Sequence, residues 1–129
     1  MTSRLVILGS LAAAIFLGSC GKPKELPYKQ LGYHDGVLTE PGTSTPFTGI
    51  ARDTYKDGKP KAEYPCRNGK FHGTVKEWHP NGQPLAETEF KDGERTGLNR
   101  EWTEAGQPYM ERVYDHDRIV SEKKYENGK

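Results

Sequence analysis

Acidic side chains recur at a fixed interval along this chain of 129 residues. Two series repeat every 24 residues: Asp53, Glu77 and Glu101, and Glu63, Glu87 and Glu111. Carboxylates on one surface repel one another unless other side chains space them or a cationic partner matches them. The series therefore predict either a solvated, solubilising surface or an acidic strip that docks a basic protein or peptide. Divalent metal binding is a third alternative, although no loop gathers the oxygens tightly.

Residue types that commonly carry catalysis are scattered along the chain. The four histidines fall at expected turns and strand ends: His34, His72, His79 and His116. The sequence contains no Gly-rich phosphate loop, no HExxH, no CxxC and no G-x-S-x-G pattern. We therefore expect a protein that is not an enzyme and that has no catalytic residues, no cofactor and no metal site.

Charge and composition exclude a further class of function. Lys and Arg number 19 and Asp and Glu number 18. Because Arg4 lies in an apolar leader, the rest of the chain is balanced, and a sequence-independent grip on nucleic acid would need a basic excess. Only 33% of the residues are hydrophobic, and the leader is rich in them, which leaves too few for a large two-layer core.

The leader reads as a secretory signal that ends at a reactive side chain. Arg4 precedes an apolar run from Leu5 to Leu17, shorter than the roughly 20 residues that span a bilayer. The string Leu17-Gly18-Ser19-Cys20 resembles the bacterial lipobox, in which the cysteine sulfur is diacylated and the signal is cleaved before it. The alternative is an ordinary signal peptide with a coincidental cysteine.

The lipobox resemblance implies a cellular location. It implies a signal peptide at residues 1–19 and a chain anchored to membrane lipid of the bacterial cell envelope through acylated Cys20. Two or three acyl chains make such an anchor stable. The absence of Asp after Cys20 implies the outer membrane, on its periplasmic side, if the source is Gram-negative.

Residues 20–46 read as the lipidated cysteine followed by a tether. Four prolines interrupt this segment: Pro23, Pro27, Pro41 and Pro46. The string Tyr33-His34-Asp35-Gly36-Val37 is typical of a short turn between Leu31 and Leu38. We expect at most one small hairpin here.

The remaining residues, 47–129, follow the 24-residue repeat throughout. The columns include Gly49, Gly73 and Gly97; Pro60, Pro84 and Pro108; and Trp78 and Trp102. Each unit has two Gly-containing turns, and Asn-Gly or Asp-Gly is a strong hairpin signal because Gly takes positive φ without steric cost. The segments between turns have strand length. The pattern predicts an all-β fold, an elongated antiparallel β-meander of about three repeats.

The turn chemistry predicts which side chains share a face. Pro80 before Asn81-Gly82 favours a type I turn with a Gly bulge, which pairs Trp78 with Pro84. In that register the Trp column shares a packed face with these residues: Ala62, Cys66, Ala86, Phe90, Met110 and Tyr114. We then expect both acidic series on the opposite face, and Lys76, Arg100 and Arg112 on the packed face, where they cannot neutralise the carboxylates.

Three local patterns together resemble a known family. They are Phe47-Thr48-Gly49, the core Trp78-x-x-Asn81-Gly82-x-Pro84, and Phe90-x-Asp92-Gly93-Glu94 followed by x-x-Gly97. These resemble the MORN-repeat variant found in proteins named YwqK-like antitoxins. The resemblance covers about residues 47–129 and implies a sheet-like repeat array used for protein contact. An antitoxin that neutralises a toxin is one function that it implies.

From these observations we expect a membrane-anchored, non-catalytic repeat lipoprotein that binds a protein partner. The contact surface is predicted on one repeat face: Tyr55, Glu77, Leu85, Glu87, Glu101, Tyr109 and Glu111. One alternative is an antitoxin or immunity protein. Another is a structural lipoprotein that binds cell wall or lipid, with Trp78 and Trp102 available for glycan.

Two further features bear on partners. Cys66 occupies the repeat position of Phe90 and Tyr114, which predicts a buried thiol; an intermolecular disulfide is the alternative. The terminal strands, near residues 50–55 and 119–125, are expected to leave open edges that can add a partner strand.

Overall fold

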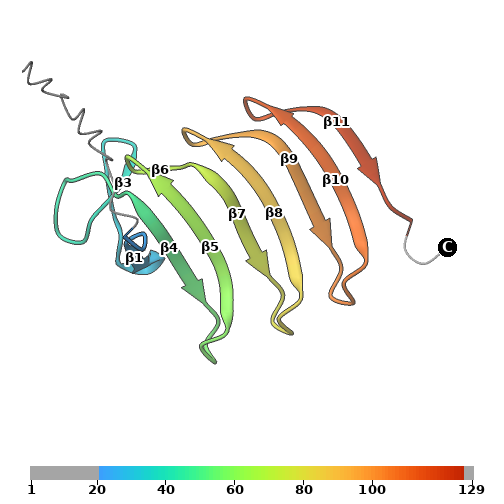
Figure 1. Ribbon diagram of the computed structural model, residues 1–129, viewed down its shortest axis with the longest axis horizontal. Helices are drawn as coiled ribbons and strands as arrows, with labels where there is room; N and C mark the ends of the chain where they lie inside the picture. The colour runs from blue at the N-terminus through green and yellow to red at the C-terminus, as the bar shows by residue number, and fades with distance from the viewer. Residues whose placement is uncertain (1–20, 127–129) are drawn as a thin grey trace, which may run out of the picture.

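The computed structural model describes residues 21–126, which form a nine-stranded sheet and a separate two-stranded hairpin (Figure 1). The expected signal peptide and Cys20 lie outside the described residues. The long strands are β4 (Gly49–Thr54), β5 (Pro60–Arg67), β7 (Gly73–Trp78), β8 (Pro84–Lys91), β9 (Glu94–Trp102), β10 (Pro108–Asp115) and β11 (Arg118–Lys124). These pair with their sequence neighbours in antiparallel fashion. The all-β, elongated meander is confirmed.

The remaining elements are short. They are β1 (Glu25–Pro27), a 3-10 turn η1 (Tyr28–Gln30), β2 (Gly32–His34), β3 (Val37–Thr39) and β6 (Lys70–Phe71). The strand β6 pairs with β5, and β2 pairs with β3. Within residues 21–126 no helix has the length and apolar character to cross a bilayer.

The two turn types of each repeat have different backbone geometry. At Asn68-Gly69 and Asp92-Gly93 both turn residues have positive φ, which is the two-residue type I′ hairpin that matches the twist of its strands. At the other end of the hairpins, Gly82 N–H donates to the carbonyl of His79 at 2.9 Å, and the amide of His79 donates to the carbonyl of Gln83 at 2.8 Å. This is the expected turn with a Gly bulge, and it pairs Trp78 with Pro84 as predicted.

A second bulge follows this turn in every repeat, and the sequence analysis missed it. The register moves from Trp78↔Pro84 to Glu77↔Ala86, so that Leu85 is an extra residue of β8. Lys61 of β5 and Tyr109 of β10 are extra residues in the same way, without a pairing partner on the preceding strand. A one-residue shift exchanges the faces of all side chains beyond it. The predicted grouping of side chains on the two faces is therefore wrong in part.

The apolar core lies at the N-terminal end of the sheet. Phe47 and Ala51 are fully buried there, and the thiol-bearing Cys66 is 6% exposed. Three leucines from the segment before the repeats pack against them: Leu26, Leu31 and Leu38. Because a single-layer sheet has no second layer of its own, this N-terminal segment supplies one for the first repeat only.

The segment expected as a tether is thus a cap on the sheet from β1 onward. The predicted hairpin around Asp35-Gly36 is present as β2 and β3. In addition, β1 pairs in parallel with β4 and covers part of the edge expected to be open. The cap lies so close to the sheet that a Cβ on Gly69 would stand 2.5 Å from the carbonyl oxygen of Leu38. The prediction failed because the prolines that suggested a tether sit at element boundaries, where they break no strand pairing.

Successive hairpins are joined by contacts that repeat with the sequence. The Tyr55 hydroxyl donates to the carbonyl of Trp78 at 2.6 Å, and His79 Nε2, in the same column, lies 2.9 Å from the carbonyl of Trp102. On the groove side, aromatic rings run in sequence from Tyr28 through Tyr64 and Phe71 to Phe90, with centroids 4.9 to 5.5 Å apart. These contacts connect the cap to the second repeat.

We predict that the Cys66 thiol is protected in the folded chain. Burial raises its pKa to about 11, and only the thiolate reacts with alkylating reagents. In a chain carrying Cys20→Ala, iodoacetamide at pH 8 should modify Cys66 at least about a hundredfold more slowly than in the same chain unfolded in urea. Equal rates in the two states would show that the thiol is accessible.

Candidate functional site

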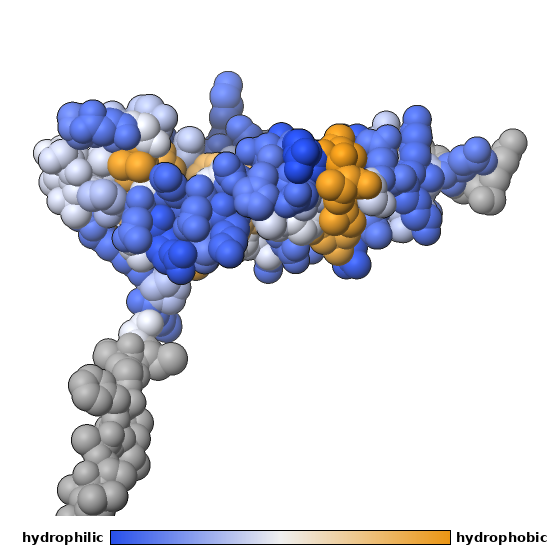
Figure 2. Space-filling model, turned by 90° about the horizontal axis from the view of Figure 1, so that it is seen from above, coloured by the Kyte–Doolittle hydropathy of each residue, from blue (hydrophilic) through white to orange (hydrophobic). Residues whose placement is uncertain are grey.

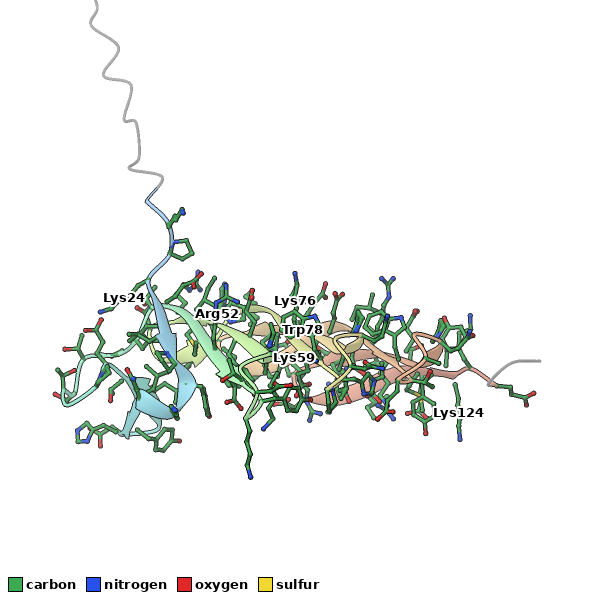
Figure 3. All side chains as sticks on the ribbon, turned by 90° about the horizontal axis from the view of Figure 1, so that it is seen from below. Lys24, Arg52, Lys59, Lys76, Trp78 and Lys124 are labelled. Carbon is green, nitrogen blue, oxygen red and sulfur yellow. The ribbon has the colours of Figure 1, made fainter. Side chains whose placement is uncertain are left out.

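The second bulge divides the charged columns between the two faces of the sheet. Residues opposite one another in antiparallel strands share a face. One face, named here the groove face, carries Asp53, Ala62, Glu77, Ala86, Glu101, Met110 and Lys124 in one row. The other, named the ladder face, carries Arg52, Glu63, Lys76, Glu87, Arg100, Glu111 and Lys123. Figure 3 shows Arg52 and Lys76 on one side of the sheet and Lys124 on the other.

The row on the ladder face alternates in charge from strand to strand. Arg52 bridges Glu25 at 2.9 Å and Glu63 at 2.5 Å, and Arg100 lies 3.5 Å from Glu111. Lys76 stands between Glu63 and Glu87 in the register. Opposite charges directly across neighbouring strands stabilise the sheet, each pair by a few tenths of a kcal/mol up to about 1 kcal/mol.

This arrangement corrects the prediction of a six-carboxylate strip. Glu87 stands between Lys76 and Arg100 in the register, and Glu111 stands between Arg100 and Lys123 and pairs with Arg100 at 3.5 Å. Lys76 and Arg100 were expected on the other face. The carboxylates of the Glu63, Glu87 and Glu111 series therefore face cationic side chains of neighbouring strands. The Asp53, Glu77 and Glu101 series lies on the groove face instead, because the bulge at Leu85 and its equivalents moves it there.

A groove of about 400 Å³ runs over the groove face from the first repeat to the third. Tyr64 and Phe71 line the end next to the cap, and Tyr114 lines the far end. Its middle is lined by Glu77, Glu101 and the bulge residue Leu85. Ala86 stands between the two glutamates in the register and is 5% exposed.

The two glutamates of the groove have different surroundings. Glu101 accepts a bond of 2.7 Å from Arg112, which also donates to Glu122 at 2.7 Å. Glu77 has no hydrogen-bond or ion-pair partner among residues 21–126. Burial, and to a lesser extent the charge of Glu101, raises the pKa of Glu77, while Lys61 opposes the shift. The charged form of Glu77 is therefore under-satisfied in the folded chain.

A second under-satisfied acceptor lines the same groove. Asn99 is 6% exposed, and its Nδ2 donates to the Thr88 hydroxyl at 2.9 Å. Its Oδ1 is the buried side-chain atom of the described chain that has no hydrogen-bond partner. An unpaired buried acceptor is unusual in folded proteins and costs free energy. The groove thus presents two acceptors, Glu77 and Asn99, that lack donors.

The predicted contact residues are therefore divided by the structure. Glu77, Leu85 and Glu101 line the groove together. Tyr109 is the bulge residue of β10 and is 37% exposed, and the Lys124 ammonium lies 5.9 Å from its ring centroid. Glu87 and Glu111 belong to the ladder. Tyr55 lies at the hairpin end, where its hydroxyl joins two repeats.

Sequence reasoning missed Asn99, Thr88 and Arg112. Asn99 is 24 residues after Val75, and Thr88 and Arg112 are 24 and 48 residues after Tyr64. In both columns a polar residue therefore replaces an apolar or aromatic one. That departure from the repeat was the available signal. In a repeat protein, a position that breaks its own column without a structural reason is a candidate for contact with a ligand.

The C-terminal end of the sheet is exposed. Every residue of β11 is solvent-accessible, and Ile119 and Val120 are 52% and 59% exposed. Figure 2 shows a hydrophobic band toward this end, and smaller hydrophobic patches near the N-terminal end, on a largely hydrophilic surface. Of the two edges expected to be open, the edge of β11 is the one that no described strand covers.

Comparison with known families supports the repeat interpretation. The family model described as MORN repeat variant matches residues 71–92, which span β7, its turn and β8. No curated protein and no solved structure is detectably similar to the chain. In the part of the chain that the structure describes, no three His, Cys, Asp or Glu side chains gather closely enough to hold a metal ion.

We predict that Glu77→Gln stabilises the chain at neutral pH. Folding raises the pKa of Glu77, so the folded chain binds this proton more tightly than the unfolded chain, and stability falls as pH rises through that range. Glutamine cannot ionise and removes this cost. The melting temperature of the variant should therefore exceed that of the wild type by more at pH 7 than at pH 4.

Glu87→Gln is the matched control, because it removes one member of the ladder. It should lower the free energy of unfolding at pH 7 by up to about 1 kcal/mol. A loss of stability in Glu77→Gln as large as that in the control would assign Glu77 a structural role instead.

Proposed function

We propose that this chain, which carries a MORN-variant repeat at residues 71–92, is a non-catalytic repeat protein that binds a protein partner at the bacterial envelope. The observation that supports binding is the groove. The cap covers the groove face over the first repeat only, and over the second and third repeats half-buried aromatic, aliphatic and carboxylate side chains line an open groove. A groove of this mixed composition is typical of protein-binding surfaces.

The anchor in this proposal is acylated Cys20. The described domain begins almost immediately after it, since β1 starts at Glu25. Five extended residues reach at most about 18 Å, so the sheet would stay near the membrane surface. A partner would then be an envelope protein or a protein that passes the envelope. A toxin is one such protein, and its capture would identify the chain as an antitoxin.

The anchor predicts the fate of a variant at Cys20. In the lipobox mechanism the thiol accepts the lipid before the signal is cleaved, so Cys20→Ala should leave an uncleaved precursor without acyl chains. Mass spectrometry of the chain purified from bacterial membranes distinguishes the two forms. Normal cleavage of the variant would contradict the lipobox and leave an ordinary signal peptide.

The groove predicts where a partner makes contact. A photo-crosslinking amino acid at Leu85, in the full chain in living cells, should capture a discrete protein, because Leu85 lines the groove and is half-buried. The same amino acid at Lys76, on the ladder face of the neighbouring strand, is the control and should capture none. Identical products from both positions, or none from Leu85, would contradict binding in the groove.

A further inference from the structure

Two polar groups of the groove that lack hydrogen-bond donors are acceptors. Glu77 contributes a carboxylate and Asn99 a buried carbonyl oxygen. The basic groups in the same groove are already paired: Arg112 with Glu101 and Glu122, and Arg95 with Asp117 at 2.9 Å. Glu77 and Asn99 therefore favour a ligand that donates hydrogen bonds and carries positive charge.

Resting on the proposed function, we infer that the groove binds a basic peptide segment of the partner and receives an arginine side chain beside Glu77 and Asn99. Ammonium and guanidinium groups both donate hydrogen bonds to carboxylates and carbonyls. Guanidinium fits this groove better, because its planar fork can serve two acceptors at once and can stack on aromatic rings. The groove already holds one such contact, with the guanidinium carbon of Arg95 4.5 Å from the ring centroid of Tyr114.

The chain's own cap shows that the near end of the groove accepts an aromatic side chain. The segment begins as β1, which pairs with the edge of β4 and places Leu26 beside Ala51, and the Tyr28 ring that follows lies 4.9 Å from that of Tyr64. Pro27 and Leu31 have φ, ψ of −60°, 129° and −68°, 142°, close to polyproline II. Tyr64 lines the near end of the groove, which continues over the next repeats. A partner segment would lie along the groove beyond this contact.

The spacing of the repeats matches the same backbone conformation. Glu77 and Glu101 are separated by one intervening strand, so their columns lie about 9.6 Å apart. A polyproline II helix returns to the same side every three residues, after about 9.3 Å. Arginines at every third position of such a peptide would therefore have the spacing of the Glu77 and Glu101 columns. Of these carboxylates Glu77 lacks a cationic partner, and an arginine at the Glu101 column would share that carboxylate with Arg112. The ligand class is a basic, proline-rich segment with this spacing.

The test uses a defined peptide and the full chain in neutral detergent. Isothermal titration calorimetry at low salt measures binding of Arg-Pro-Pro-Arg-Pro-Pro-Arg, with citrulline in place of arginine as the uncharged control. We expect the wild-type chain and Glu87→Gln to bind within twofold of each other. Glu77→Gln should weaken binding about tenfold or more, the usual effect of removing a charged hydrogen-bond partner. Asn99→Val, which restores the residue type of the second repeat, should weaken it while keeping the fold.

Acidification adds a readout that a structural role would not give. The peptide needs ionised Glu77, so its affinity should fall as pH is lowered through the raised pKa of Glu77, and this dependence should disappear in Glu77→Gln. The charged groups that face Glu77 are Lys61 from β5 and Glu101 from β9, and both stay unchanged in that variant. Tyr64, on the same face, has a pKa raised by burial and stays neutral in this range.

Three results would overturn the inference. They are equal binding by Glu77→Gln and wild type, equal loss in Glu77→Gln and Glu87→Gln, and equal affinity for the citrulline peptide. A peptide with arginines four residues apart that binds as well would overturn the polyproline match. If the peptide fails while a partner is still captured at Leu85, the basic-peptide inference falls and the proposed function stands. If both fail, both fall.

Discussion

A one-residue bulge decides what each face of this sheet can do. It lies three residues after the turn glycine of each repeat, at Lys61, Leu85 and Tyr109. The bulge shifts one strand of each hairpin against the other and brings Glu77 opposite Ala86. Since side chains alternate along a strand, the bulge determines which face each later residue of that strand occupies, as far as the next turn. The bulge thus separates two acidic series that are otherwise identical in spacing.

The separation gives the two faces different physical roles. On the ladder face, acids and bases alternate across neighbouring strands, and Arg52 and Arg100 form ion pairs there. On the groove face, Asp53 pairs with Lys61 and Glu101 with Arg112, but Glu77 stands between Ala62 and Ala86, which cannot satisfy it. A sheet with one layer cannot bury both faces. The ladder stabilises the array from one side, and the other side is covered at its first repeat by the cap and forms the groove beyond it.

Much of this fold could be predicted from the sequence, because its signals are local. Turns such as Asp92-Gly93 need positive φ, and the Gly spacing alone fixes where the hairpins reverse. The register next to the turn, Trp78 with Pro84, also followed from turn chemistry. The bulge at Leu85 has no local signal of this kind, since Leu, Lys and Tyr occupy the equivalent positions. One missed residue was enough to assign Glu77, Glu101 and Lys76 to the wrong faces.

The cap and the polar groove residues needed tertiary information. Leu26, Leu31 and Leu38 show neither helical nor strand periodicity, and only the burial of Phe47 and Ala51 beneath them explains their placement. Asn99 is the polar member of a repeat column that holds Val75 in the preceding repeat. Its significance comes from burial without a partner for Oδ1, which no sequence pattern reports.

The measurement that tests the division of the faces most directly is a two-dimensional NMR titration. The ¹⁵N-labelled full chain in detergent micelles would be titrated with the arginine peptide. The account predicts that the side-chain amide of Asn99 and the backbone amides of Ala86 and Thr88 shift, while the side chains of Arg52 and Arg100 on the ladder face do not. Shifts concentrated on the ladder arginines, or none at saturating peptide, would contradict it.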